Sequence, residues 1–177
     1  MSRISALIIR RRESMDYLRD LKGPRSWGNN DRNNMLDLFL VFSGGAELYR
    51  CPVQTVANHP EARERDTIAP GRFGLRLGVD PRLFSGRING IVGAYDLEGD
   101  WTDYASVQPD DLARWLQHDT RLPKAKPSDP DVIVTTRVAW SAGCIVHHPD
   151  DLARVNEIFN AAGKRAGDVI PCELVVV

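Results

Sequence analysis

Apolar residues recur at every second position between Thr67 and Val79, and this alternation constrains the fold more than any other feature of the chain. Phe73, Leu75, Leu77 and Val79 share the register. Since successive side chains of a strand point to opposite faces, the pattern predicts a strand with one buried face. The chain is therefore expected to build a sheet around an apolar core.

Further strands are expected along the whole chain. Residues 37–42 and 46–51 flank Ser43-Gly44-Gly45, which predicts a β-hairpin. Other apolar runs that are typical of strands span residues 3–10, 88–95, 132–134 and 168–177.

Helical patterns are fewer. Apolar spacing predicts a helix over residues 13–22. Pro109 and Pro149 each precede two aspartates, which suits the first turn of a helix because acids meet the positive end of its dipole. These signals predict helices over residues 109–119 and from residue 149 onward. The second should pack on the core through Leu152, Val155, Ile158, Phe159 and Ala162, with Gly163 and Gly167 as stop signals.

The length of 177 residues suits one α+β, mostly β domain. Residues 1–36 are interpreted as an N-terminal strand, helix and loop appended to a domain over residues 37–177.

Composition excludes several classes of protein. The formal net charge is −1, so no global field attracts nucleic acid. No apolar stretch approaches the roughly 20 residues of a membrane helix, and the N-terminus lacks the pattern of a secretory signal. No metal-ligand spacing, P-loop or dinucleotide fingerprint occurs, so no metal or cofactor is expected.

Three widely spaced cysteines form neither a disulfide framework nor a Cys-x-x-Cys metal site. Cys51 and Cys172 end or lie in strand-like runs and are predicted to be small buried hydrophobes.

Cys144 follows Gly143, which permits a tight turn and close approach of a substrate. Backbone N–H groups at such a turn can face an oxyanion, and a thiolate there is a competent nucleophile. The alternative is a buried cysteine entering a strand, with Gly143 making the bend.

Four histidines are candidates for the base that would activate Cys144: His59, His118, His147 and His148. His118 precedes Cys144 through a long loop, and loop length adds little closure entropy. A histidine ending a helix, as expected there, is also a common cap. In a regular strand His147 would point away from Cys144, and His148 would lie about 13 Å along it.

Three further residues are candidates for substrate binding. Arg137 has the guanidinium geometry that suits a carboxylate, although it is also typical of a protein surface. Trp140 would line a groove or belong to the core. Ser141 opens the run that leads to Cys144.

The run Ser141-Ala142-Gly143-Cys144-Ile145 resembles the signature of the L,D-transpeptidase (YkuD-like) family, and Ile68-Ala69-Pro70-Gly71-Arg72-Phe73 resembles that family's strand entry. The resemblance extends from about Asp37 to the C-terminus. It implies a sandwich-type sheet with peripheral helices, a periplasmic or cell-wall location, and a peptidoglycan stem peptide as substrate. Cys144 would form a thioester, His118 would be the base, and Gly143 and Cys144 would donate N–H groups to the oxyanion.

The chain departs from the family pattern at several positions. Ala142 and Val146 replace the usual polar residues, and no histidine stands at the usual spacing before Ser141. Alternatively, Ile88-Asn89-Gly90-Ile91 occupies the family's Ile-His-Gly position with Asn89 in place of the histidine, in which case the domain is a weak enzyme or a binder. A peptidoglycan-binding relative without catalysis, a secreted or phage-associated wall-degrading toxin, and a cytosolic thiol enzyme therefore remain alternatives. The sequence leaves transfer and hydrolysis equally open.

Overall fold

Strands dominate the computed structural model, which describes residues 3–14, 35–56, 67–78, 89–99, 101–103, 116–119 and 144–177. The helix α2 spans Pro149–Ala161. The strands are β1 (Ile4–Arg10), β2 (Asp37–Ser43), β3 (Ala46–Gln54), β4 (Gly71–Arg76), β5 (Asn89–Tyr95), β6 (Trp101–Asp103), β7 (Leu116–Asp119), β8 (Ile145–His147) and β9 (Val169–Val176). The expectation of a mostly β chain with few helices is confirmed.

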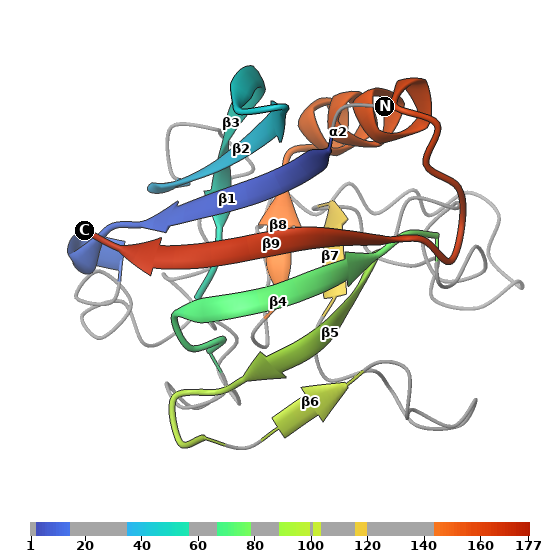
Figure 1. The fold of residues 1–177 in the computed structure, drawn as a ribbon. Coiled ribbons are helices and arrows are strands. Elements are labelled where there is room, and N and C mark those ends of the chain that lie inside the picture. Colours follow the sequence, from blue (N-terminus) through green and yellow to red (C-terminus); the bar gives the residue numbers. More distant parts are fainter. Residues whose placement is uncertain are drawn as a thin grey trace, which may run out of the picture.

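The strands form one curled mixed sheet in the order β4-β9-β1-β2-β3-β8-β7-β5-β6. Strand β4, the first in this order, also pairs with β5, the next to last. This additional pairing closes the sheet on itself. Figure 1 shows the result, with β1, β9 and β4 on one side and β7 and β8 behind them. The pairs β1–β9 and β7–β8 are parallel, and the other pairs of this order are antiparallel.

The N-terminal strand β1 lies in the interior of this sheet, between β2 and β9. Its alternate residues Ile4, Ala6 and Ile8 are buried in the main core. The segment 1–36, interpreted from sequence as an appendage, thus contributes an interior strand. The boundary drawn at residue 36 falls between two hydrogen-bonded strands.

The predicted hairpin is confirmed as β2 and β3. Its two connecting residues, Gly44 and Gly45, have φ angles of 58° and 88°. Two successive positive φ angles are typical of the type I′ turn, whose twist matches that of the flanking strands. Gly44-Gly45 therefore fixes the register next to the turn, and an irregularity between Val41 and Phe42 shifts the pairing by one residue beyond it.

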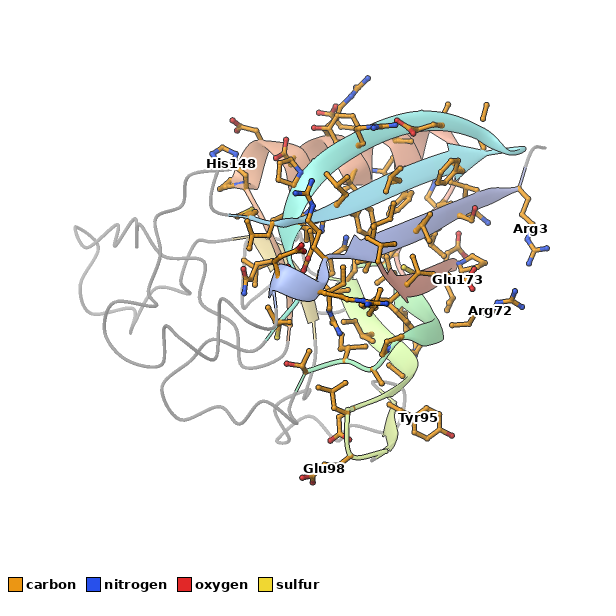
Figure 2. All side chains as sticks on the ribbon, turned by 90° about the vertical axis from the view of Figure 1, so that its left-hand side faces the viewer. Arg3, Arg72, Tyr95, Glu98, His148 and Glu173 are labelled. Carbon is orange, nitrogen blue, oxygen red and sulfur yellow. The ribbon has the colours of Figure 1, made fainter. Side chains whose placement is uncertain are left out.

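Strand β4 confirms the alternation seen in the sequence. Phe73, Leu75 and Leu77 are buried, and Arg72, which immediately precedes them, is exposed. Arg72 faces Glu173 of β9, with 3.6 Å between its Nε and the carboxylate Oε1 (Figure 2). Since this pair is solvent-exposed, burial of the opposite face accounts for most of the stability of β4.

Gly74 of β4 lies where two side chains leave no room for a Cβ. A Cβ built there would lie 2.4 Å from Cγ1 of Val169 and 2.8 Å from Cγ2 of Val92. Because valine is stiff at χ1, we expect Gly74→Ala to lower the free energy of unfolding by about 1–3 kcal/mol. Chemical denaturation measures this loss. Adding Val169→Ala, at a site 48% exposed, should recover part of it, and an additive loss in the double variant would contradict this explanation.

Helix α2 begins after His148, whose Nδ1 accepts the backbone N–H of Asp150 at 3.3 Å. It buries the predicted residues Leu152, Val155 and Phe159, and Ile158 and Ala162 pack against the core at its edge. Gly163 follows the helix with a φ of 80°, as the stop signal predicted. The Tyr49 hydroxyl donates to Asp151 at 2.8 Å, which ties the first turn of α2 to β3.

The predicted helix over residues 109–119 is wrong in its last four residues, which form β7. This segment is hydrogen-bonded between β5 and β8. Sheet pairing on both sides outweighs the weak local preference for helix. Residues 109–115, the predicted strand 132–134 and the predicted helix beyond Ser14 lie outside the described residues.

A buried polar cluster joins the end of β1 to the start of β2 and to the residue that follows β3. Arg10, 1% exposed, donates from Nε to Thr55 Oγ1 at 2.8 Å and from Nη2 to the Thr55 carbonyl at 2.8 Å. Its Nη1 donates to the Ile68 carbonyl at 2.7 Å. Asp37 accepts from the hydroxyls of Ser14 and Thr55. We call Arg10, Ser14, Asp37 and Thr55 the arginine cluster.

Burial has opposite effects on the two charged members of the arginine cluster. It lowers the pKa of Arg10 to about 10, against the opposing effect of Asp37, so the guanidinium stays charged at neutral pH. Burial also raises the pKa of Asp37, although four hydrogen-bonding or charged neighbours oppose the shift. The cluster thus holds a desolvated cation by carbonyl and hydroxyl oxygens and a nearby carboxyl group.

Candidate thiol site

Cys144 lies immediately before β8, so the candidate nucleophile stands at the entry to a buried strand. It is 8% exposed and packs with Met35 and Val146 in a small apolar cluster apart from the main core. The other residues predicted around it, Gly143, Ser141, Trp140 and Arg137, lie outside the described part of the chain.

The other two cysteines are buried in the main core, as predicted. Cys51 is 2% exposed and Cys172 is 3% exposed. Burial raises the pKa of the Cys172 thiol, so this side chain stays a protonated, inert hydrophobe. Cys144 is therefore the most exposed of the three cysteines and the one that lies outside the main core.

His118 lies in β7 and not at the end of a helix, which corrects the expectation that it caps one. Strands β7 and β8 are parallel, and the register pairs His118 with Val146. Val146 is two residues from Cys144, which corresponds to roughly 6.6 Å along a strand. The described part of His118 is its backbone. Two segments 26 residues apart in sequence are thus brought to neighbouring positions of one ladder.

His147 belongs to the main core and lies on the opposite side of β8 from Val146, as strand alternation predicts. It is fully buried, and its ring meets Phe39 edge-on with centroids 4.9 Å apart. Its Nδ1 lies 3.6 Å from Cys51 Sγ. His148 caps α2, and His59 is outside the described residues. The described contacts of His147 and His148 therefore serve packing and helix capping.

A buried amide network that sequence reasoning missed lies beside His147. Gln117 Nε2 is 2.9 Å from His147 Nε2, and Asn89 Nδ2 donates to Gln117 Oε1 at 2.9 Å. Asn89 also donates to Asn156 of α2 at 3.1 Å. Through these hydrogen bonds Asn89 links β5, β7 and α2. Sequence alternation gives no signal for such a network, because its members come from four separate segments.

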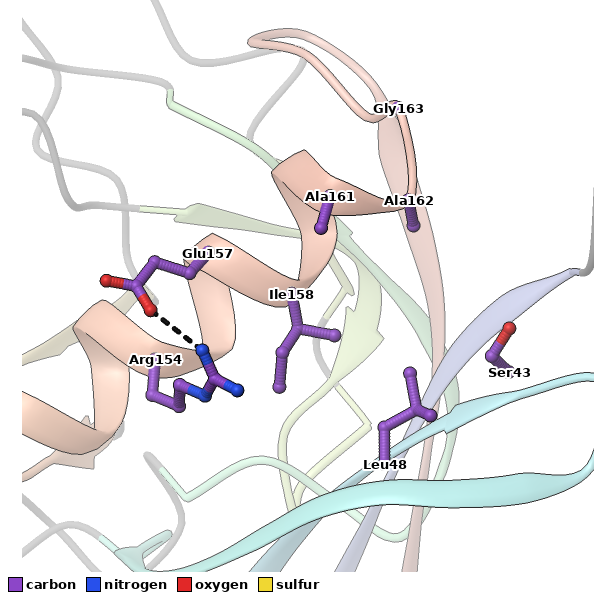
Figure 3. Close-up of a pocket in the computed structure, with 8 residues that line it drawn as sticks. All are labelled: Ser43, Leu48, Arg154, Glu157, Ile158, Ala161, Ala162 and Gly163. Atoms are coloured by element: carbon purple, nitrogen blue, oxygen red, sulfur yellow. Dashed lines mark hydrogen bonds and ion pairs between the residues drawn. The ribbon is translucent and has the colours of Figure 1, made fainter.

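A groove lies between α2 and the β2–β3 hairpin, near the hairpin turn (Figure 3). Strand β8, which follows Cys144, pairs with the other end of β3. It has a volume of about 630 Å³, and a 3.1 Å bond between Arg154 and Glu157 runs along its helix side. The described lining residues are Ser43, Leu48, Arg154, Glu157, Ile158, Ala161, Ala162 and Gly163. None of these is a site residue predicted from the sequence.

The described ranges hold no helix that is long and apolar enough to cross a membrane. Nor do three His, Cys, Asp or Glu side chains gather there as metal ligands.

Comparison with known proteins shows the family to which the chain belongs. An uncharacterized protein of Treponema pallidum (strain Nichols) is 37% identical over 174 residues, a match that covers 90% of this chain and 74% of the relative. The chain belongs to the family of that protein. Because so little of the chain is left out, the family match takes in both β7 and β8. No protein-family model and no solved structure matches the chain.

Proposed function

We propose that the protein is a cysteine acyl transferase that acts on peptidoglycan stem peptides, with Cys144 as nucleophile and His118 as base. The observation that carries this proposal is the register of β7 against β8, with His118 opposite a residue only two positions from Cys144. A base must come within hydrogen-bond reach of the thiol, and the parallel pairing of β7 with β8 supports this role by bringing the two chain segments side by side. The resemblance of Ser141-Ala142-Gly143-Cys144-Ile145 to the L,D-transpeptidase signature supplies the substrate class.

In this proposal His118 takes the proton of Cys144, and the thiolate attacks the amide carbonyl of a diaminopimelate residue. The backbone N–H groups of Gly143 and Cys144 stabilise the oxyanion of the tetrahedral intermediate. Collapse breaks the amide C–N bond, and His118 returns its proton to the leaving amine of D-alanine. The resulting thioester is then attacked by an amine, which forms a cross-link, or by water, which gives hydrolysis.

The fold class and the environment of Cys144 support the proposal to different degrees. The mostly β curled sheet supports an L,D-transpeptidase-like, sandwich-type fold at the level of fold class alone. Cys144 is itself buried, at 8% exposed, and differs from Cys51 and Cys172 in lying outside the main core. Arg137, Trp140 and Ser141 are proposed to bind the stem peptide, and the resemblance places this chemistry in the periplasm or cell wall.

A second candidate function is binding of peptidoglycan without catalysis. The packing of Cys144 against Met35 and Val146 favours it, because apolar surroundings disfavour a charged thiolate. A wall-degrading toxin would use the same hydrolytic chemistry as the first proposal and would differ in its target cell.

Intact-mass spectrometry with a stem tetrapeptide ending in D-alanine tests the proposal. We expect a covalent adduct of the acyl tripeptide at Cys144, together with free D-alanine. Cys144→Ala should give neither product, and Cys51→Ala should give both, because Cys51 is buried in the main core. Binding of the peptide without release of D-alanine would contradict the enzyme and favour the binding protein.

A further inference from the structure

Strands β7 and β8 are too short to fix their own register through the backbone. Strand β7 has four residues and β8 has three, and their ladder consists of three residue pairs. A slip of two residues would keep every side chain on its original face, so apolar burial resists such a slip only weakly. The same slip would move residue 118 by roughly 6.6 Å relative to Cys144. Some other interaction must therefore specify the register.

The amide network supplies a specific tie between these two strands. Gln117 and His147 are both fully buried, and their side chains meet at 2.9 Å. Gln117 is the neighbour of His118 in β7, and it pairs with Ile145, the neighbour of Cys144. Gln117 thus lies one residue from His118, and His147 lies three residues from Cys144. A buried polar pair of this kind specifies register because a slipped partner leaves both groups unsatisfied.

The direction of every hydrogen bond in the network follows from one backbone donor. The Gly78 N–H donates to Asn89 Oδ1 at 3.1 Å, so the Asn89 nitrogen must donate to Gln117 Oε1. Gln117 Nε2 then donates to His147 Nε2, which leaves the ring proton on Nδ1, facing Cys51. His147 is thereby assigned as the neutral Nδ1–H tautomer. Each amide is held by its neighbour, so neither Gln117 nor Asn89 can flip without placing donor against donor.

The network also anchors β7 to elements outside the pair. Asn89 belongs to β5, and through it Gln117 is connected to Asn156 of α2 at 3.1 Å. On the other side His147 reaches Cys51 of β3. Four successive strands of the sheet, β3, β8, β7 and β5, and the helix are thus connected by side chains. A change in register of β7 against β8 would break this connection at its centre.

We infer that Gln117 and His147 are positioning residues that set the register of β7 on β8 and hence the separation of His118 from Cys144. The inference deepens the proposed function and rests on it for its catalytic meaning. Its structural content, the register itself, is independent of any chemistry at Cys144.

Disulfide mapping in the variant His118→Cys/Val146→Cys reads the register directly. Paired strands lie roughly 4.8 Å apart, which is within the Cα separation of a disulfide, and a two-residue offset is outside it. We therefore expect oxidation to link positions 118 and 146, with little product between 118 and the natural Cys144. Adding Gln117→Met should lower the ratio of the first product to the second at least tenfold. Gln117→Glu should keep the native link, because its carboxylate accepts from both Asn89 and the other tautomer of His147.

Ile170→Val is the matched control for lost stability. Ile170 is fully buried in β9, away from β7 and β8, and its substitution should leave the disulfide ratio within about twofold. In the chain with natural cysteines, Gln117→Met should also move the pH profile of Cys144 alkylation toward that of a free thiol. Unchanged cross-linking in Gln117→Met overturns the inference, whatever the reactivity of Cys144. An unactivated Cys144 in the unsubstituted protein overturns the proposed function, whatever the cross-linking shows.

Discussion

Replacing Arg10 by alanine is expected to lower the free energy of unfolding by about 3–5 kcal/mol. The substitution removes three buried hydrogen bonds, two to backbone carbonyls and one to the Thr55 hydroxyl. The carbonyl oxygens of Thr55 and Ile68 would be left without these donors, and Asp37 would lose its neighbouring cation. Urea denaturation followed by circular dichroism measures the change.

Arg12→Ala is the matched control, because Arg12 is an exposed arginine two residues along the chain. It should change stability by no more than about 0.5 kcal/mol. The double variant Arg10→Ala/Asp37→Asn should lose less than the sum of its single variants, since the second change removes the unpaired buried charge. A loss below about 1 kcal/mol for Arg10→Ala would mean that the arginine cluster does not hold β1 in the sheet.

His118→Ala is expected to slow the release of D-alanine from a stem tetrapeptide by a factor of about 10²–10⁴, the usual contribution of a general base. The effect should fall on kcat, because His118 is proposed to move a proton and not to bind the peptide. Steady-state kinetics with detection of free D-alanine measures it. Unchanged circular dichroism should accompany the loss.

His148→Asn removes a nearby imidazole while keeping a residue that caps α2 well. Its kcat should stay within about threefold of the unsubstituted protein, because His148 serves as N-cap. If His118→Ala retained full activity and His148→Asn lost it, the base would be His148 and not His118.

The elements that follow from local chemistry were predictable from the sequence. The Gly44-Gly45 turn, the alternation around Leu75 and the proline and acids at the start of α2 each act within a few residues. Strand β7 was not predictable in this way, because its ladders with β5 and β8 join residues 26 or 28 positions apart along the chain. Its sequence carries helix signals that pairing on both sides outweighs.

In the candidate site, too, the features set by local sequence were predictable, and those set by long-range strand pairing were not. Cys144 stands out in the sequence because of Gly143 and the neighbouring motif, and Cys51 and Cys172 are buried as their runs predict. The proximity of His118 to Cys144 depends on the parallel pairing of β7 with β8, which the sequence does not reveal. The network through Gln117 could not be predicted for the same reason. The hydrogen-bond partners of this buried amide, Asn89 and His147, are distant from it in sequence.

The most direct test of the central claim is the pH dependence of alkylation at Cys144, resolved by peptide mass mapping of the folded protein. Cys51 and Cys172 are internal controls and should stay unmodified, because both are buried in the main core. The account predicts a midpoint for Cys144 well below the value of about 8.5 for a free thiol, and predicts that His118→Ala removes the shift. A midpoint at or above that value, indifferent to His118, would contradict an activated nucleophile at Cys144.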